Sequence, residues 1–138
     1  MMLEWSDRFL IGHERIDFEH RTFFGLVVDF QKARINGADK KTLAGLLEEI
    51  ALYAKFHFRS EENVMEQMHY PDLESHRNEH YRLVEVLSNK MLGLEMDLYT
   101  ASDIEEFLVE WFVGHTSGVD KKIVQYQKSL ESAAQLTE

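Results

Sequence analysis

The chain has no cysteine among its 138 residues, and Pro71 is its only proline. The lack of cysteine excludes disulfides, iron–sulfur clusters and a cysteine nucleophile, so any metal must be held by histidine, carboxylate or water. No run approaches the roughly 18 apolar residues that a membrane span needs. The N-terminus lacks the basic and apolar regions of a signal peptide. We therefore expect no membrane association and a cytoplasmic location.

Positive charge is also scarce, because 25 acidic residues face 15 lysines and arginines, for a net charge of −10. A chain this acidic repels phosphate backbones, so we expect no nucleic-acid partner. Its length and its 44% hydrophobic content are those of one ordinary globular domain with a real core. We expect a single domain over residues 1–138.

Hydrophobic residues recur with helical period over most of the chain, and no segment is a strong strand candidate. The boundaries are predicted from an N-cap at Asp17, a stop at Asn36-Gly37, the break at Pro71, a stop at Gly93 and a capping box of Ser102 with Glu105. Four helices joined by short connections are typical of an all-α, up-down-up-down four-helix bundle. The predicted elements are an N-terminal arm at 1–16 and helices at about 17–35, 40–67, 72–92 and 102–132.

Five of the seven histidines fall inside these predicted helices, and every helix carries at least one. A single histidine in a bundle is usually a surface residue or a satisfied core residue. Five histidines that could all face inward are hard to bury without a metal, because unsatisfied ring nitrogens cost free energy. The two others, His13 and His69, are expected at the surface. The five candidates are His20, His57, His76, His80 and His115.

The spacing of these residues indicates which of them share a helix face. His76 and His80 lie four apart, as in the zinc-protease motif H-E-x-x-H, but Arg77 stands where that chemistry needs a glutamate. Glu61 follows His57 by four residues and shares its face.

Asp120 follows His115 by five residues, which places it about 7.5 Å along the axis and well round the helix. Either a bulge near Gly118 lets these two side chains meet, or they serve different metals.

The number of candidate ligands favours two ions. Two octahedral ions offer about twelve positions. Five histidines, two bridging carboxylates and one bridging oxide or hydroxide would fill about eleven of them. One position would then stay open for an exogenous ligand.

The segments "IDFEH", "HFRSEE", "HRNEH" and "WFVGHTSGVD" resemble, in order and spacing, the hemerythrin family in its bacterial single-domain form. All seven ligand positions match, and the resemblance covers nearly the whole chain. Thr116 is one departure, since the family often has an apolar residue there, and it puts local packing in doubt. The resemblance implies a four-helix bundle around two non-heme iron ions with an oxo or hydroxo bridge.

The resemblance also implies a role for each ligand. One iron would take three histidines, and the other would take two and carry the open site, where the family binds O2 reversibly. Both carboxylates would bridge the ions. The implied ligands are His76, His80 and His115 for the first iron, His20 and His57 for the second, and Glu61 and Asp120 for the bridges.

Reversible O2 binding, for storage, delivery or sensing, is the leading interpretation, with O2 as partner and no catalytic residue. Ferritin-like enzymes use two E-x-x-H motifs, and this chain has one, Glu66 to His69. A centre rich in imidazole and poor in carboxylate favours binding over oxygenation. The alternatives are a diiron enzyme acting on peroxide or nitric oxide, with Tyr53 as candidate helper, and a purely structural metal. We expect a monomer or weak oligomer, with or without a protein partner.

The surroundings of the centre are predicted less directly. We expect Phe24 and Trp111 to line the O2 pocket. Asp17 is expected either to orient His20 or to act only as an N-cap. Glu62 and Glu66 are expected on the solvated surface.

Overall fold

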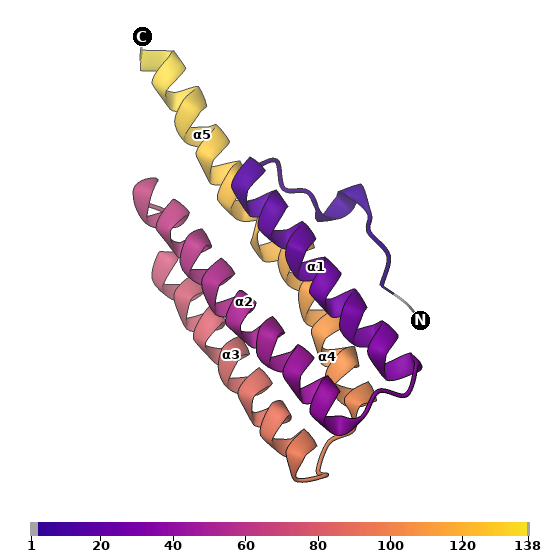
Figure 1. Ribbon diagram of the computed structural model, residues 1–138. Helices are drawn as coiled ribbons and strands as arrows, with labels where there is room; N and C mark the ends of the chain where they lie inside the picture. The colour runs from indigo at the N-terminus through magenta and orange to yellow at the C-terminus, as the bar shows by residue number, and fades with distance from the viewer. Residues whose placement is uncertain (1–2, 138) are drawn as a thin grey trace.

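The computed structural model describes residues 3–137, with the side chains of all of these except residues 117, 119 and 135–137. This part of the chain contains helices and no strand. Four long helical segments pack side by side, each antiparallel to the next (Figure 1). The predicted all-α four-helix bundle is thereby confirmed. The segments are α1 (Glu14–Ile35), α2 (Lys40–Gln67), α3 (Leu73–Glu95) and a fourth made of α4 (Ala101–Gly114), the π-helical turn η2 (His115–Val119) and α5 (Lys121–Thr137).

Three apolar clusters fill the interior of the bundle over the described residues. The largest cluster includes Phe30, Leu47 and Leu108, and it fills the half nearer the α1–α2 and α3–α4 connections. Two smaller clusters, one with Ile16 and Val124 and the other with Met65 and Ile123, lie toward the opposite end. The candidate metal ligands come between these clusters along each helix, so apolar side chains enclose them from both ends. Within the described residues, no helix has the length and apolar character needed to cross a membrane.

The first helix begins earlier than predicted, which shortens the predicted arm. Its N-cap is His13, whose Nδ1 accepts a hydrogen bond from the backbone N–H of Ile16 at 3.3 Å. Asp17 therefore lies inside the first turn. Its carboxylate instead accepts hydrogen bonds from the N–H groups of Ile11 (2.7 Å) and Gly12 (3.1 Å). The predictions that Asp17 caps α1 or orients His20 were wrong, because these oxygens fasten the arm to the helix.

The boundaries around the α3–α4 connection also differ from the prediction. Gly93 does not end α3, and its place inside the helix has a steric reason: a Cβ there would lie 2.1 Å from the Tyr99 ring. The left-handed residue of the connection is Asp97, with φ of 59°.

The predicted capping box of Ser102 and Glu105 was wrong by two residues. Thr100 is the N-cap of α4 and forms the box with Asp103. Glu105 is buried instead and forms an ion pair with Arg34 of α1.

The N-terminal arm lies along the outer side of α1 (Figure 1). It contains a short 3₁₀ helix, η1 (Asp7–Phe9), whose Phe9 is fully buried. The Phe9 ring packs edge-on against Phe112 of α4, with centroids 5.2 Å apart. Trp5 packs on Phe9 and on Phe24 of α1. The arm thus covers the seam between α1 and α4, on the side where His20 lies.

Candidate metal centre

All seven predicted ligands are buried and converge at one level of the bundle. The five histidines are each at most 4% exposed, and both carboxylates are fully buried. Every helical segment of the bundle contributes at least one of them. They form two groups of four that share a single carboxylate. The groups are Glu61, His76, His80 and His115, and His20, His57, Glu61 and Asp120.

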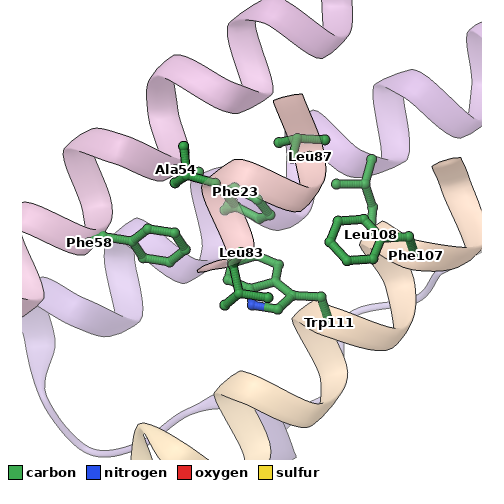
Figure 2. Close-up of a pocket in the computed structure, with 9 residues that line it drawn as sticks. Phe23, Ala54, Phe58, Leu83, Leu87, Phe107, Leu108 and Trp111 are labelled. Atoms are coloured by element: carbon green, nitrogen blue, oxygen red, sulfur yellow. The ribbon is translucent and has the colours of Figure 1, made fainter. Parts of the chain in front are cut away.

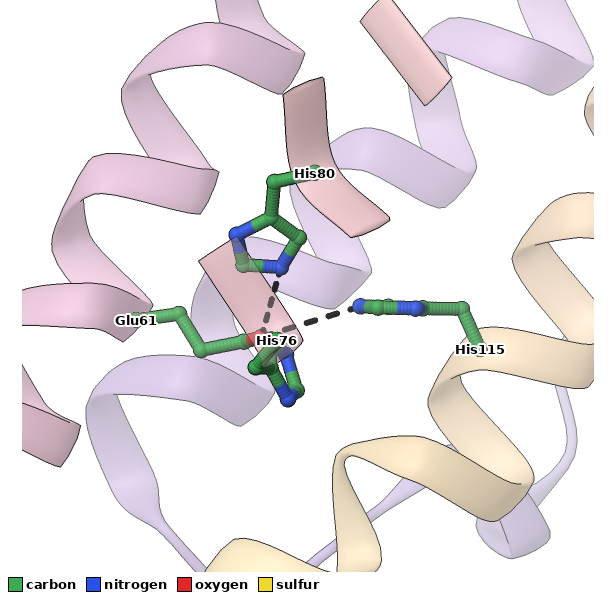
Figure 3. Close-up of side chains that lie close together, drawn as sticks. All are labelled: Glu61, His76, His80 and His115. Carbon is green, nitrogen blue, oxygen red and sulfur yellow. Dashed lines mark hydrogen bonds and ion pairs between the residues drawn. The ribbon is translucent and has the colours of Figure 1, made fainter. Parts of the chain in front are cut away.

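Three histidines surround one oxygen of Glu61 in the first group (Figure 3). Their Nε2 atoms lie at 2.5 Å, 3.1 Å and 3.6 Å from Oε1, for His76, His80 and His115 respectively. His76 and His80 project from successive turns of α3, and His115 approaches from the end of α4. The H-x-x-x-H pair therefore acts from one helix face, as its spacing predicted.

The second group gathers around the other oxygen of Glu61. Its Oε2 lies 3.2 Å from Nε2 of His57 and 3.9 Å from Nε2 of His20. Asp120 is divided in the same way between the groups. Its Oδ2 lies 2.8 Å from Nε2 of His20, and its Oδ1 lies 2.9 Å from Nε2 of His115. Each carboxylate thus presents one oxygen to each group.

A π-helical turn brings His115 and Asp120 together. The backbone N–H of Asp120 donates to the carbonyl of His115 at 3.0 Å, an i→i+5 bond. Such a bond adds one residue to the turn, and isolated π turns are frequent at functional sites. Of the two possibilities left by the spacing of five, the structure has the local bulge. His115 belongs to the first group, whereas Asp120 belongs to the second group and also faces the first through Oδ1.

The residues fit a metal better than they fit one another. Nε2 of His20, of His57 and of His115 are buried without a hydrogen-bond partner among the described residues, as are both oxygens of Asp120 and Oε2 of Glu61. Several of these atoms lie within 2.8–3.2 Å of each other but are not aligned as donor and acceptor. Buried polar atoms of a native protein are almost always satisfied. A metal cation would satisfy these converging nitrogen and oxygen lone pairs, which have no hydrogen-bond donor among the described residues.

The charge balance agrees with this fit. Burial opposes ionisation of Glu61, but contacts with the surrounding histidines outweigh it and hold the Glu61 pKa well below its ordinary value. Burial also disfavours the charged form of His57, yet its contacts with Glu19 and Glu61 raise the His57 pKa to about 9. The pKa of His76 is likewise raised to about 9, against burial, by Asp120 and Glu61. The site therefore favours positive charge, which divalent cations would supply in place of protons.

Three carboxylates outside the two groups face ligand histidines, and the sequence did not identify them. Glu19 lies 2.8 Å from Nδ1 of His57, and Glu62 lies 2.7 Å from Nδ1 of His80. Glu79 lies 3.6 Å from Nδ1 of His115. The prediction that Glu62 belongs to the solvated surface was wrong, since it is 8% exposed.

An apolar cavity lies among α1, α2, α3 and α4 (Figure 2), and two of its lining residues stack on histidines of the first group. Trp111 lines it, and its ring stacks on His115 with centroids 5.3 Å apart. Phe58 also lines it and stacks on His80 at 4.1 Å. Phe24 does not line this cavity; it packs instead on Trp5 and Phe112. Its neighbour Phe23 is the residue of α1 that faces the cavity.

Three further residues of the sequence analysis lie outside the two groups. Tyr53, the candidate helper of an enzyme, packs on Phe23 and Phe56. His69 is exposed, as expected, and has a left-handed backbone with φ of 52°. His13 is half-buried and caps α1.

Comparisons with known proteins agree on one family. The model of the hemerythrin HHE cation-binding domain matches residues 11–126. A bacteriohemerythrin of Clostridium acetobutylicum is 28% identical over 131 residues, which cover 89% of this chain and 99% of the relative. One of Methylococcus capsulatus is 31% identical over 108 residues, covering 76% and 80%. A crystal structure of wild-type hemerythrin matches with a TM-score of 0.79 and 25% identity, covering 88% of this chain and 94% of the other.

Proposed function

The chain belongs to the hemerythrin family, and on that premise we propose that it binds O2 reversibly at a non-heme diiron centre. The family is known for O2 binding at such a centre. The observation that carries the proposal is the division of Glu61 and Asp120 between two groups of buried histidines. A single structural ion would not need two carboxylates that each face both groups.

We assign one iron to the three-histidine group and the other to the two-histidine group. The first would be held by His76, His80 and His115, and the second by His20 and His57. Glu61 and Asp120 would contact both ions, with an oxo or hydroxo bridge between them. The chemistry that a pair of ferrous ions supplies is reversible electron transfer to O2. The group with fewer histidines would keep the position where O2 enters.

The chain itself surrounds part of the centre with apolar rings. Phe112 lies with its ring centroid 6.3 Å from that of His20, and Phe58 and Trp111 cover His80 and His115. Apolar rings limit the entry of water and anions that would compete with O2. A ligand set with more imidazoles than carboxylates carries little negative charge, so it would stabilise higher oxidation states of iron only weakly. Both features favour release of O2 over its consumption.

The two residues predicted for the O2 pocket differ in their contacts with the ligand histidines. We propose that Trp111 contributes to the pocket from the side of the three-histidine group, because its ring stacks on His115. It also contacts Phe58, whose ring lies 5.9 Å from that of His57 in the two-histidine group. For Phe24 the contacts with Trp5 and Phe112 support a packing role at one remove from the ligands. Replacing Trp111 by leucine should therefore change the O2 dissociation rate more than replacing Phe24 by leucine, as stopped-flow absorption would measure.

The proposal is tested by the absorption spectrum of protein loaded with ferrous iron without oxygen, then exposed to O2, then depleted of it. A visible charge-transfer band should appear with O2 and fade as the ferrous state returns, with two irons per chain. His57→Ala should abolish the band. His69→Asn should retain it, because His69 is exposed and asparagine tolerates its left-handed backbone.

Two other outcomes would overturn the proposal. Direct conversion to ferric protein without the band would favour an enzyme acting on peroxide or nitric oxide. A spectrum that does not respond to O2 would leave only a structural metal.

A further inference from the structure

Three carboxylates outside the two groups link consecutive helices through ligand histidines. Glu19 of α1 faces His57 of α2, and Glu62 of α2 faces His80 of α3. Glu79 of α3 faces His115, which follows α4. In each pair the acid belongs to one helix and the histidine to the next one along the chain. The pairs with Glu19 and Glu62 are close, while the pair with Glu79 is 3.6 Å apart and its carboxylate is 37% exposed on the side chain.

Glu19 is held in place at both of its oxygens. Oε1 lies 2.8 Å from Nδ1 of His57, and Oε2 accepts a hydrogen bond from the hydroxyl of Ser60 at 2.7 Å. The guanidinium of Arg15 approaches the second oxygen at 3.4 Å. The residue is only 4% exposed. It is therefore a fixed acceptor aimed at one imidazole.

An ionised carboxylate can only accept hydrogen bonds, so the ring nitrogen that faces it must be the donor. Nδ1 of His57 then carries the hydrogen. In the neutral ring that binds a metal, the lone pair is therefore on Nε2, the atom that lies 3.2 Å from Glu61 in the metal-free structure. The same reasoning applies to His80, whose Nδ1 faces Glu62 and whose Nε2 lies 3.1 Å from Glu61. Both pairs select the tautomer that a metal ligand needs.

The two groups are thus built alike in one respect: each contains one closely paired histidine. His57 is the closely paired histidine of the two-histidine group, and His80 is that of the three-histidine group. Nδ1 of His20, by contrast, is buried without a hydrogen-bond partner among the described residues. An imidazole that donates to a carboxylate is oriented by it and is a more basic ligand.

We propose that Glu19 and Glu62 are positioning residues, each fixing the tautomer and ring orientation of one ligand histidine, in opposite halves of the centre. This inference rests on the proposed metal centre. Loss of either carboxylate should weaken binding of one ion more than the other, because each acts on a histidine of a different group. Glu79 should contribute less, given its longer distance and greater exposure.

The test uses zinc(II), which accepts the same ligands and is diamagnetic. Zinc affinity is measured by competition with a chelator for the wild type, Glu19→Gln and Glu62→Gln. Glu66→Gln serves as control, because Glu66 is exposed on the same helix as Glu62. Loss of such a partner typically costs 10- to 100-fold in metal affinity, and we expect a loss at the lower end for one of the two ions. The control should match the wild type.

Nitrogen-15 NMR of the zinc-loaded proteins separates positioning from general stability. In the wild type, Nδ1–H of His57 and of His80 should appear as slowly exchanging protons. Glu19→Gln should shift and broaden only the first, and Glu62→Gln only the second. A merely structural role would move both or neither. Ser60→Ala removes the hydrogen bond that the Ser60 hydroxyl donates to Glu19, so it should change the His57 signal mildly. This variant tests the role of Glu19 even if Glu19→Gln does not fold.

The outcomes distinguish this inference from the proposed function. A wild type that does not take up two zinc ions would overturn both. Normal uptake by the wild type, with unchanged affinity and unchanged imidazole signals in the variants, would overturn only the positioning role.

Discussion

His115 and Asp120 lie five residues apart on one helical segment, yet Nε2 of the histidine is 2.9 Å from Oδ1 of the aspartate. A regular α-helix would turn the second side chain roughly 140° away from the first. The π-helical turn between them, closed by the bond from the Asp120 N–H to the His115 carbonyl, removes that difference. The relationship depends on the backbone as much as on the two side chains.

Replacing Asp120 by asparagine should lower the pKa of both His20 and His115 in the metal-free protein. Burial lowers the pKa of each histidine, and Asp120 is the first cause that opposes burial at both. Asparagine keeps the shape but removes the charge. Proton NMR titration would measure the shift, and zinc titration should show weaker binding of the second ion. Unchanged titration of both histidines would contradict this prediction. Glu66→Gln serves again as the surface control.

The metal-free protein should lose stability as the pH rises toward alkaline values. The pKa values of His57 and His76 are raised from 6.5 to about 9, so their contribution is fully present below pH 6.5 and is lost as the pH rises through about 9. Such a rise corresponds to roughly 3.4 kcal/mol per group at the upper limit. Urea unfolding across this range would measure the loss.

The zinc-loaded protein is the control for this prediction. Metal binding requires deprotonated histidines, so its affinity should instead increase up to about pH 9. A metal-free protein whose free energy of unfolding stays level or rises between pH 6.5 and about 9 would refute the assignment of these protons.

Replacing Phe9 by alanine should destabilise the protein by about 3 to 5 kcal/mol, the usual cost of removing a buried phenylalanine. Its ring is fully buried between Trp5 and Phe112. Phe18→Ala is a matched control, because Phe18 is 73% exposed and should change stability by less than about 0.5 kcal/mol. Urea unfolding measures both. Equal effects of the two substitutions would mean that the arm does not seal the α1–α4 seam.

Replacing Thr100 by alanine should cost about 1 kcal/mol, because Thr100 caps α4 and its hydroxyl accepts the backbone N–H of Asp103. Ser102→Ala should have little effect, since Ser102 is exposed inside the first turn. Thermal unfolding of the two variants compares the capping box that the structure contains with the one that the sequence predicted. A larger loss of stability for Ser102→Ala than for Thr100→Ala would indicate that Ser102, and not Thr100, caps α4.

The errors at helix ends have local physical causes. Serine and threonine two residues apart are both good caps, and only the course of the backbone decides between Thr100 and Ser102. Gly93 matches a helix stop signal, but its missing side chain makes room for the Tyr99 ring. No local sequence pattern indicates that contact. His13 is an unusual cap, so α1 was predicted to begin at the more typical Asp17.

The metal centre shows the same contrast between contacts that a local sequence pattern predicts and contacts that only helix packing creates. Spacing placed His57 with Glu61, and His76 with His80, because each pair is four residues apart on one helix. The pairs of Glu19 with His57 and of Glu62 with His80 join residues 38 and 18 positions apart on different helices. No periodicity within one helix can indicate such a contact, and an acid on an amphipathic helix is most simply interpreted as surface.

The sequence by itself determined the helices, the bundle class and the family, because hydrophobic period and motif spacing are properties of the chain read in order. It also identified the seven residues that converge in the structure. Only the tertiary structure decided how their oxygens and nitrogens divide into two groups, which acids orient the histidines from outside, and how a π turn admits Asp120. These depend on the angles and offsets at which four helices pack, and distant residues set them together.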